Sequence, residues 1–439
     1  MSSNPANVNR VAADRFSRLK ALQRPACLPQ TKIGTDATGN QLKEMPSRSP
    51  AASGSERLAT LLGATVCRNE HGEHLSLVSI HGEYSPCNLD SSAFHLLTPN
   101  APAEAADPKQ WLFLDTETTG LSGGTGTYPF LIGLAWWEGN ELKIEQLFMR
   151  EYSEERSMLD AVAERLKERP VLVTFNGKSF DWPLLETRFR MTRTIAPPPV
   201  RAHLDFLHPA RNLWRLRLGS VKLSQLERHV LGWDRGEDVS SGDIPRIYLE
   251  FVCGGNAEPL VPVFLHNQMD LRGLAGLACR ILSIFGDQEK PLEDAFELYG
   301  LSRICERRGQ AERARTTYEK SISAALPAET DRAARASLAR LAKRARDFAC
   351  ACELWESMLG NSREGYEAYE QLAIYYEHEA RNAQLALAIT RNALAQLRRA
   401  HQLAMIAADQ YRASKLQFEH RRLRLERKTQ AMAPSLFNS

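Results

Sequence analysis

Short apolar, β-prone runs alternate with helical patterns between residues 108 and 285. In chain order they predict three strands with short links, a helix, a fourth strand and a second helix, over 111–115, 130–137, 142–149, 158–168, 171–177 and 181–191. Strands joined by such short links favour an antiparallel meander. The pattern therefore predicts an α/β domain, over about 107–286, with a mixed sheet and flanking helices.

From about residue 291 the apolar spacing becomes helical throughout, and the composition shifts to Ala, Arg and Glu. The pattern recurs at roughly 34–37 residues and predicts helix pairs over 298–322, 334–359 and 368–394. In each pair a small residue precedes Tyr318, Trp355 or Thr390 by four positions, namely Ala314, Ala351 and Ala386. This resembles tetratricopeptide repeats over 291–400, and a non-repeat helical bundle is the alternative.

The flanks of these two regions have less regular patterns. Residues 1–55 mix Pro, Ser, Asn and basic residues, which predicts a mostly disordered leader. Residues 56–106 predict a small N-terminal region with a helix and some strands, whose role the pattern does not reveal. Residues 401–439 predict a basic helix and tail that caps the repeats or attracts phosphates.

Composition and charge narrow the class of protein. The 439 residues are 43% hydrophobic and 25% charged with a net charge of +3, which suits two or three ordinary globular domains. Eight cysteines lack metal-type spacing and are interpreted as reduced thiols. The longest uncharged apolar run is YPFLIGLAWW, far below the roughly 20 residues that span a bilayer. We expect a cytoplasmic protein that does not enter a membrane.

Two carboxylates follow the first predicted strand in WLFLDTETTG. Asp115 and Glu117 are two residues apart, so in a strand they project from the same face and repel each other. Divalent cations between them would relieve the repulsion, and such oxygen ligands suit Mg²⁺ or Mn²⁺. The alternative is an ordinary pair of solvated acids at a strand end.

Two further stretches carry polar residues at structured positions. In TFNGKSFDWPLLETR a strand ends near Asn176, and Asp181 opens the next helix, where it could also be only a helix cap. In VFLHNQMDLRGLAGL helical spacing puts His266 and Asp270 on one face, which a surface pair would equally explain. Taken singly, each stretch favours the structural interpretation.

Together the three stretches match, in order and context, the motifs of the DEDD 3′–5′ exonucleases, whose fold is ribonuclease H-like. The chain resembles most the YprB-like branch, through FLDTETTGL, FNGKSFDWPLLETR, HLDFLHPARNLWR, SQLERHVLGWDR, DIPRIYLEF and HNQMDL, over about 105–282. Members of that branch often carry tetratricopeptide-like helices behind the nuclease domain. The resemblance therefore implies a nuclease domain followed by helical repeats.

The resemblance also assigns roles. It makes Asp115, Glu117, Asp181 and Asp270 the ligands of two divalent cations, Mg²⁺ or Mn²⁺, with His266 at the position of the general base. In His-type members the His precedes the last Asp by five residues, whereas the spacing here is four, as in the Tyr-type group. Asp205 is given a positioning role, because the four-carboxylate set is complete without it.

Substrate contacts are expected from the basic stretch 188–217, which holds seven Arg and one acidic residue. Such a stretch can follow a phosphate backbone while an aromatic ring stacks on a base. The predicted substrate-binding residues are Asn176, Lys178, Arg211, Trp214 and Arg215. The glycine-rich GLSGGTGTY lacks the GKS or GKT ending of a nucleoside-triphosphate loop.

The sequence thus predicts a metal-dependent nuclease, foremost a 3′–5′ exonuclease acting on DNA or RNA. Its helical repeats would dock a protein partner or guide substrate. A non-catalytic nucleic-acid-binding or scaffold protein with the same fold is the main alternative, and four intact carboxylates argue against it. Internal cleavage, as in ribonuclease H, is a third reading.

Overall fold

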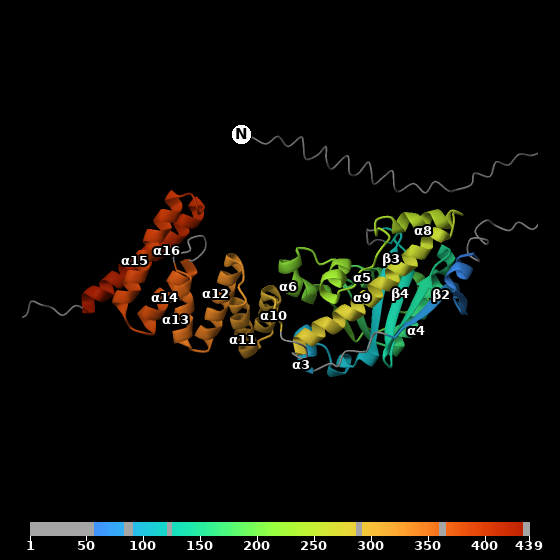
Figure 1. Ribbon diagram of the computed structural model, residues 1–439, viewed down its shortest axis with the longest axis horizontal. Coiled ribbons are helices and arrows are strands. Elements are labelled where there is room, and N and C mark those ends of the chain that lie inside the picture. Colours follow the sequence, from blue (N-terminus) through green and yellow to red (C-terminus); the bar gives the residue numbers. More distant parts are fainter. Residues whose placement is uncertain (1–56, 83–90, 121–124, 287–291, 360–365, 433–439) are drawn as a thin grey trace, which may run out of the picture.

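The computed structural model describes residues 57–82, 91–120, 125–286, 292–359 and 366–432. The predicted leader over 1–55 lies outside these residues. Seven strands form one sheet in the order β1-β2-β5-β4-β3-β6-β7 (Figure 1). They are β1 Thr65–Asn69, β2 Gly72–His81, β3 Trp111–Thr118, β4 Pro129–Glu138, β5 Glu141–Phe148, β6 Val171–Thr174 and β7 Ala202–Asp205.

Helices surround this sheet. They are α3 Ser91–Leu97, α4 Glu155–Glu168, α5 Asp181–Thr192, α6 Leu207–Leu218, α7 Leu223–Leu226, α8 Ile244–Val252 and α9 Val261–Gly286. Short 3-10 or π turns are η1 Ala103–Ala106, η2 Pro108–Gln110, η3 Tyr152–Glu154, η4 Glu227–Leu231 and η5 Glu258–Leu260. The mixed sheet with flanking helices confirms the predicted α/β class.

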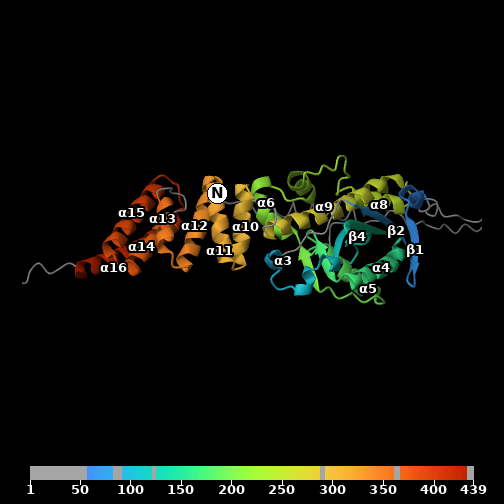
Figure 2. The same ribbon diagram turned by 60° about the horizontal axis from the view of Figure 1, so that its bottom comes forward.

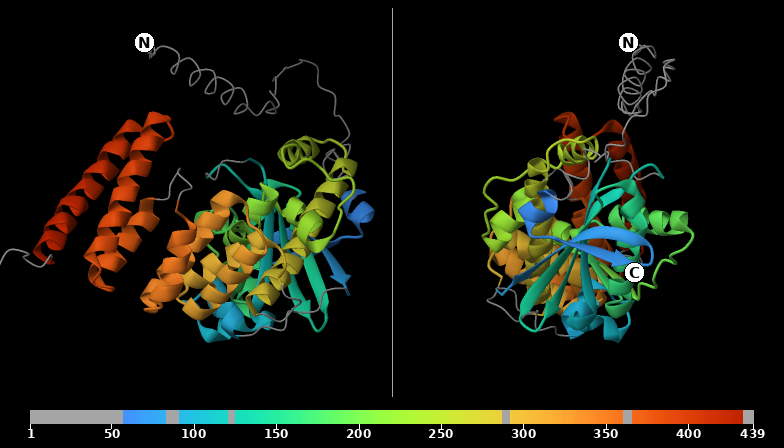
Figure 3. Two further views of the ribbon diagram at one scale, coloured as in Figure 1. Left: turned by 60° about the vertical axis from the view of Figure 1, so that its left-hand side comes forward. Right: turned by 90° about the vertical axis from the view of Figure 1, so that its right-hand side faces the viewer.

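The centre of the sheet is buried on both faces, which explains the continuous apolar run at the start of β3. Trp111 and Phe113 enter one hydrophobic core, whereas Leu112 and Leu114 enter the other. Successive side chains of a strand point to opposite faces, so a strand covered on both sides needs apolar residues at every position. Helices accordingly lie on both sides of the sheet (Figure 3).

The pairing of the strands is mixed, as predicted. β3, β4 and β5 form an antiparallel meander, while β6 pairs parallel with β3 and β7 parallel with β6. The parallel pairs need crossover connections, and α4 and α5 supply them. All parallel strands therefore end at the same edge of the sheet, where the motif residues lie.

The described strands of the predicted N-terminal region, β1 and β2, extend the sheet. β1 and β2 form a hairpin, and β2 pairs antiparallel with β5 from Leu75 to His81. Phe94 of α3 packs into the same core as the C-terminal half of α9. Two of the seven strands thus come from a region that the sequence left without a role.

The C-terminal region is helical and extends away from the sheet in a row (Figures 1 and 2). Its helices are α10 Ala295–Arg307, α11 Ala311–Ser323, α12 Ala328–Arg344, α13 Phe348–Ser357, α14 Tyr366–His378, α15 Ala383–Gln402 and α16 Ala408–Met432. Ala314, Ala351 and Ala386 are fully buried, as close packing at these positions requires. The all-helical class of this region is confirmed, and its identity as tetratricopeptide repeats stays a prediction.

Packing crosses the boundary predicted near residue 291. Tyr299 and Tyr318 belong to the same hydrophobic core as Trp111 of β3. The indole of Trp214 on α6 donates to Glu297 of α10 at 2.9 Å, and Arg217 forms an ion pair with the same carboxylate. The change in sequence pattern at 291 marks a change of element type, but the core continues into the first helix pairs.

The basic segment at the C-terminus is largely the helix α16, which packs on the helices before it. Phe418 and Leu425 of α16 are buried. Arg424 and Lys428 of α16 form ion pairs with Glu377 of α14. These contacts show that α16 packs on α14, and both its predicted roles, capping and phosphate attraction, stay predictions. Within the described residues, no helix combines the length and apolar character needed to cross a bilayer.

Candidate active site

Asp115 and Glu117 lie at the end of β3, on the same face of the sheet. Both are partly buried, and the pairing of β3 with β4 shifts register between Glu117 and Thr118. The intervening Thr116 points to the other carboxylate motif, since its hydroxyl donates to Asp181 Oδ1 at 2.6 Å. The strand end therefore contacts the second motif directly.

Asp181 is the first residue of α5, and Phe180 is the cap. The predicted cap interpretation of Asp181 is thus not what the structure has. The loop before it turns at Asn176, which has a φ of 71°. The Asp205 carboxylate accepts from the backbone N–H groups of Asn176 at 2.8 Å and Lys178 at 3.2 Å. Asp205 therefore fixes the loop that leads to Asp181, which agrees with its predicted positioning role.

α9 carries His266 and Asp270 on one face. The Nε2 atom of His266 lies 3.7 Å from Asp270 Oδ2 and 3.9 Å from Glu117 Oε1. The late helix is thereby brought against the end of β3, although about 150 residues separate them in sequence. All four predicted carboxylates and His266 meet in one place.

The electrostatics of this cluster are those of crowded acids. Burial first, and then the charge of Asp270, raise the pKa of both Asp115 and Glu117 well above their ordinary values. Burial also raises the pKa of Asp181 to about 6, against the hydrogen bond from Thr116. Negative charge at this site is therefore costly in the free protein, and cations would relieve it.

Two amides that the sequence did not single out orient the first carboxylate. Asn267 Nδ2 donates to Asp115 Oδ2 at 2.8 Å, and Gln146 Nε2 donates to Asn267 Oδ1 at 2.8 Å. Gly133 is paired with Asp115 across the sheet, and a Cβ there would clash with the Asn267 amide and lie 2.7 Å from Leu271. A glycine inside a buried strand indicates that another group packs closely on the backbone, so Gly133 could have pointed to Asn267 from the sequence.

A second group, from the stretch before α8, contacts the motif residues of α9. Asp238 Oδ1 lies 2.7 Å from His266 Nδ1. Arg235 bonds both Asp270 and Glu227. Burial opposes the charge of Arg235, but the hydrogen bond to Glu227 and the charge of Asp270 outweigh it and raise its pKa. The sequence pointed to this stretch only through the family resemblance and gave it no role.

Comparison with known proteins agrees with this geometry. The profile of the RNase H superfamily matches residues 112–281, which span β3 to α9. A Bacillus subtilis (strain 168) protein named "Uncharacterized protein YprB" is 30% identical over 326 residues, which are 72% of this chain and 77% of YprB. The chain belongs to the YprB family. Members of the RNase H superfamily are generally nucleases.

A solved structure that this chain also matches is the family B DNA polymerase from the hyperthermophilic archaeon Pyrobaculum calidifontis. The match covers 47% of this chain and 28% of that polymerase, with 16% identity and a TM-score of 0.33. A likeness of this size carries no weight for the function of the YprB-family chain.

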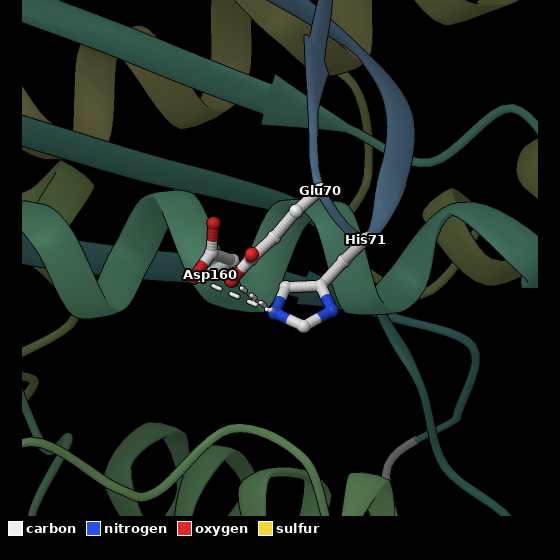
Figure 4. A group of neighbouring side chains, drawn as sticks. All are labelled: Glu70, His71 and Asp160. Carbon is white, nitrogen blue, oxygen red and sulfur yellow. Dashed lines mark ion pairs between the residues drawn. The ribbon is translucent and has the colours of Figure 1, made fainter.

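The carboxylate oxygens of this YprB-family site fit hard divalent cations in type, number and crowding. Among the described residues, no three of these side chains bring their ligand atoms within 4.8 Å of one another, and Asp270 pairs with Arg235 while Asp115 accepts from Asn267. In the part of the chain that is described, a tighter group is Glu70, His71 and Asp160, whose ligand atoms lie within 4.8 Å of one another (Figure 4). It lies at the β1–β2 turn and α4, with Glu70 exposed, and we interpret it as a surface ion-pair group.

The predicted substrate-binding residues differ in their exposure to solvent. Asn176 and Lys178 lie in the loop before Asp181, and Arg211 and Arg215 are exposed on α6. Trp214 is 0% exposed and its indole is engaged by Glu297, so it cannot stack on a base, and that prediction is corrected. The period of α6 turns Trp214 inward toward α10, while Arg211 and Arg215 face out.

The aromatic ring available near the site is Phe180, which is 60% exposed. It lines a cavity of about 520 Å³ together with Thr116 and Asp181. Sequence reasoning missed it, because an aromatic residue beside a helix start is usually part of the core. An exposed ring next to the carboxylates offers a surface on which a base can stack.

Proposed function

We propose that this YprB-family protein is a metal-dependent nuclease that hydrolyses phosphodiester bonds of DNA or RNA, and that it acts as a 3′–5′ exonuclease. The observation that carries the proposal is the convergence of Asp115, Glu117, Asp181 and Asp270 from three distant segments, with raised pKa values in the first three. A protein has little reason to bury crowded acids together unless cations balance them.

The four carboxylates would hold two divalent cations, Mg²⁺ or Mn²⁺. Bound there, the cations would supply charge neutralisation at the phosphate and a more acidic attacking water. Asn267 and Thr116 donate to Asp115 and Asp181 and so restrict the orientation of these two carboxylates.

His266 is suited to accept a proton from the attacking water at its Nε2 atom, which faces Glu117 and Asp270. Asp238 accepts from Nδ1–H, which keeps the free electron pair of the neutral imidazole on Nε2. This pairing gives His266 a defined tautomer in the role that the resemblance implies. The exposed Phe180 beside the site would stack on the terminal base.

The test uses the purified full chain with end-labelled single- and double-stranded DNA and RNA, in Mg²⁺, Mn²⁺ or chelator. We expect cation-dependent cleavage that shortens 5′-labelled strands progressively from the 3′ end, and none with Asp115→Asn. Fragments that arise at internal positions from the start would show an endonuclease instead. No cleavage of any substrate by the wild-type chain would refute the proposal.

One observation favours a non-catalytic alternative. Arg235 is a built-in cation beside Asp270, and such an internal counter-ion would serve a scaffold that never takes up metal. Calorimetric titration with Mn²⁺ separates the two functions. Binding that is lost in Asp181→Asn supports the nuclease, whereas no binding by the wild-type chain supports the scaffold.

A further inference from the structure

A second cavity, of about 340 Å³, lies where the sheet domain meets the helical region. Lys178 follows β6, His203 is in β7, His208 is in α6 and Arg308 follows α10. The carbonyl ends of α3 at Leu96 and Leu97 close one side. The cavity is thus built from segments that lie far apart in the sequence.

The loop 176–180 separates this cavity from the candidate active site. Lys178 lines the second cavity, whereas Ser179, Phe180 and Asp181 line the cavity beside the carboxylates. A strand that leaves the carboxylates by crossing this short loop therefore arrives at Lys178. The same short loop therefore contributes residues to both cavities.

The second cavity presents positive charge. Of the described residues that line it, Asp205 is the acidic one, and its carboxylate is buried and accepts from the N–H groups of Asn176, Lys178 and Leu207. These three hydrogen bonds direct the carboxylate of Asp205 toward the backbone of the protein. Lys178 is exposed, and no ion pair joins it to any residue in the described ranges. Its ammonium is available to an anion.

Arg308, the second cation that lines the cavity, is held in place by hydrogen bonds to α3. Its Nε donates to Leu96 O at 3.0 Å and its Nη2 donates to Leu97 O at 3.1 Å. A guanidinium has five N–H donors, so others remain after these two bonds. A cation held by carbonyl groups alone keeps its full charge and loses little freedom when it binds a phosphate.

His203 adds a neutral polar group. Burial, and then the nearby charge of Lys178, lower the pKa of His203 to about 4, so its ring is neutral at physiological pH. One ring nitrogen lies 2.8 Å from the Thr174 hydroxyl. Lys178 and Arg308 therefore supply positive charge to the lining, against the one carboxylate of Asp205.

We propose that this cavity is a phosphate-binding subsite, which holds a backbone phosphate of the nucleic-acid strand at a distance from the bond that is cut. The subsite rests on the nuclease function proposed above, since it names where the substrate of that site continues. Arg308 belongs to the helical region, so that region takes part in holding substrate through its first helix.

The test measures binding, in chelator, of labelled single-stranded DNA and RNA to the full chain by fluorescence anisotropy. Lys178→Gln should weaken binding of long oligonucleotides by about tenfold. It should also lower the slope of log affinity against log salt by about 0.7, as expected when one phosphate contact is lost. Lys178→Arg should restore both. Lys320→Gln on α11 is the matched control, because Lys320 is exposed and outside the cavity.

Length distinguishes a subsite from general attraction. If the cavity holds a phosphate beyond those at the catalytic end, Lys178→Gln should weaken binding of a dinucleotide far less than binding of a long strand. Competition by a nucleoside monophosphate tests the other source of the same phosphate chemistry. If the monophosphate binds through Lys178 while oligonucleotide affinity does not depend on Lys178, the cavity holds a free nucleotide and the strand path is wrong.

The outcomes keep the two proposals apart. If the wild-type chain cleaves nucleic acid but Lys178→Gln binds as Lys320→Gln does at every length, the subsite is overturned and the nuclease stands. If the wild-type chain cleaves nothing, yet Lys178→Gln shows the length-dependent loss, the subsite stands and catalysis fails.

Discussion

Buried carboxylates occur at both ends of the molecule, and their surroundings differ in charge. At the candidate active site Asp115 and Glu117 lie among other acids, and burial together with Asp270 raises their pKa values. In the helical region the Glu377 side chain is fully buried and meets Arg421, Arg424 and Lys428. Burial opposes the charge of Glu377, but hydrogen bonds from Lys428 and Arg424 prevail and lower its pKa.

The difference separates a structural acid from a functional one. Glu377 ties α14 to α16 with cations that the chain itself provides, so its charge contributes to stability. Of the site carboxylates, Asp270 pairs with Arg235, and the proposed function assigns the remaining charge to cations from solution. Burial alone therefore does not point to a functional acid, whereas burial without enough internal counter-charge marks a candidate for one.

The strongest test of the difference between the two kinds of buried acid is to neutralise one acid of the candidate active site. Asp115→Asn should reduce cation-dependent cleavage by at least about 10³-fold, because charge stabilisation by bound cations is worth several kcal/mol. The free energy of unfolding without metal should rise, since a crowded charge is removed. Parallel cleavage and denaturation measurements test this, and a variant that cleaves normally would contradict the role of Asp115.

His266 tests whether the site contains a base as well as ligands. His266→Ala should lower turnover by roughly 10²–10⁴-fold and leave Mn²⁺ affinity nearly unchanged. Asp238→Asn should cause a smaller loss, because it weakens only the orientation of the ring. Single-turnover cleavage and calorimetry give the two readouts. Loss of metal from His266→Ala would make it a ligand instead.

Glu377 tests the structural side of the comparison. Glu377→Gln should destabilise the packing of α14 on α16 by about 2–4 kcal/mol, because it leaves a cluster of cations without their carboxylate. Hydrogen exchange of α16 amides measures this. Glu379→Gln is the control, since Glu379 is exposed and its ion pair with Arg346 spans 3.5 Å. Equal protection in the two variants would show that burial of Glu377 contributes nothing.

The two regions should also respond to pH with opposite sign. The pKa of Asp181 is raised to about 6 in the folded chain, so its destabilising charge is present above pH 6 and disappears as pH falls toward 4. Asp181→Asn should therefore stabilise the metal-free chain at pH 8 by about 1–2 kcal/mol and hardly at all at pH 4.

The pKa of Glu377 is lowered, so its contribution is present above its unfolded pKa and lost as pH falls through its folded one. The destabilisation caused by Glu377→Gln should accordingly shrink in acid. Denaturant unfolding of both variants and the wild-type chain between pH 4 and 8 checks the two signs. The same sign for both variants would remove the distinction.

The sequence was most informative where a local pattern sufficed. Apolar runs predicted β3 to β6 and the antiparallel meander, because strands buried on both faces need continuous apolar residues. The motif residues Asp115, Asp181 and Asp270 were found through their order and context, and the structure brings them together. Their roles as metal ligands stay predictions.

Features set by long-range packing could not be predicted from local patterns. Arg235 and Asp238 were not predicted, because they reach the site through contacts with α9 that sequence spacing does not indicate. Trp214 looked like a stacking residue because it lies among arginines, but α10 covers it. The hairpin of β1 and β2 looks like a short isolated region in the sequence, because its pairing with β5 depends on residues about 65 positions later in the chain.

α9 also has a consequence for how the protein is made. It supplies His266, Asn267 and Asp270, which meet Asp115 only after about 150 further residues have been synthesised. A chain still emerging from the ribosome therefore has β3 and α5 without the late helix, and its acid cluster is incomplete. Because contacts between such distant segments form slowly, assembly of the site should be one of the last events in folding.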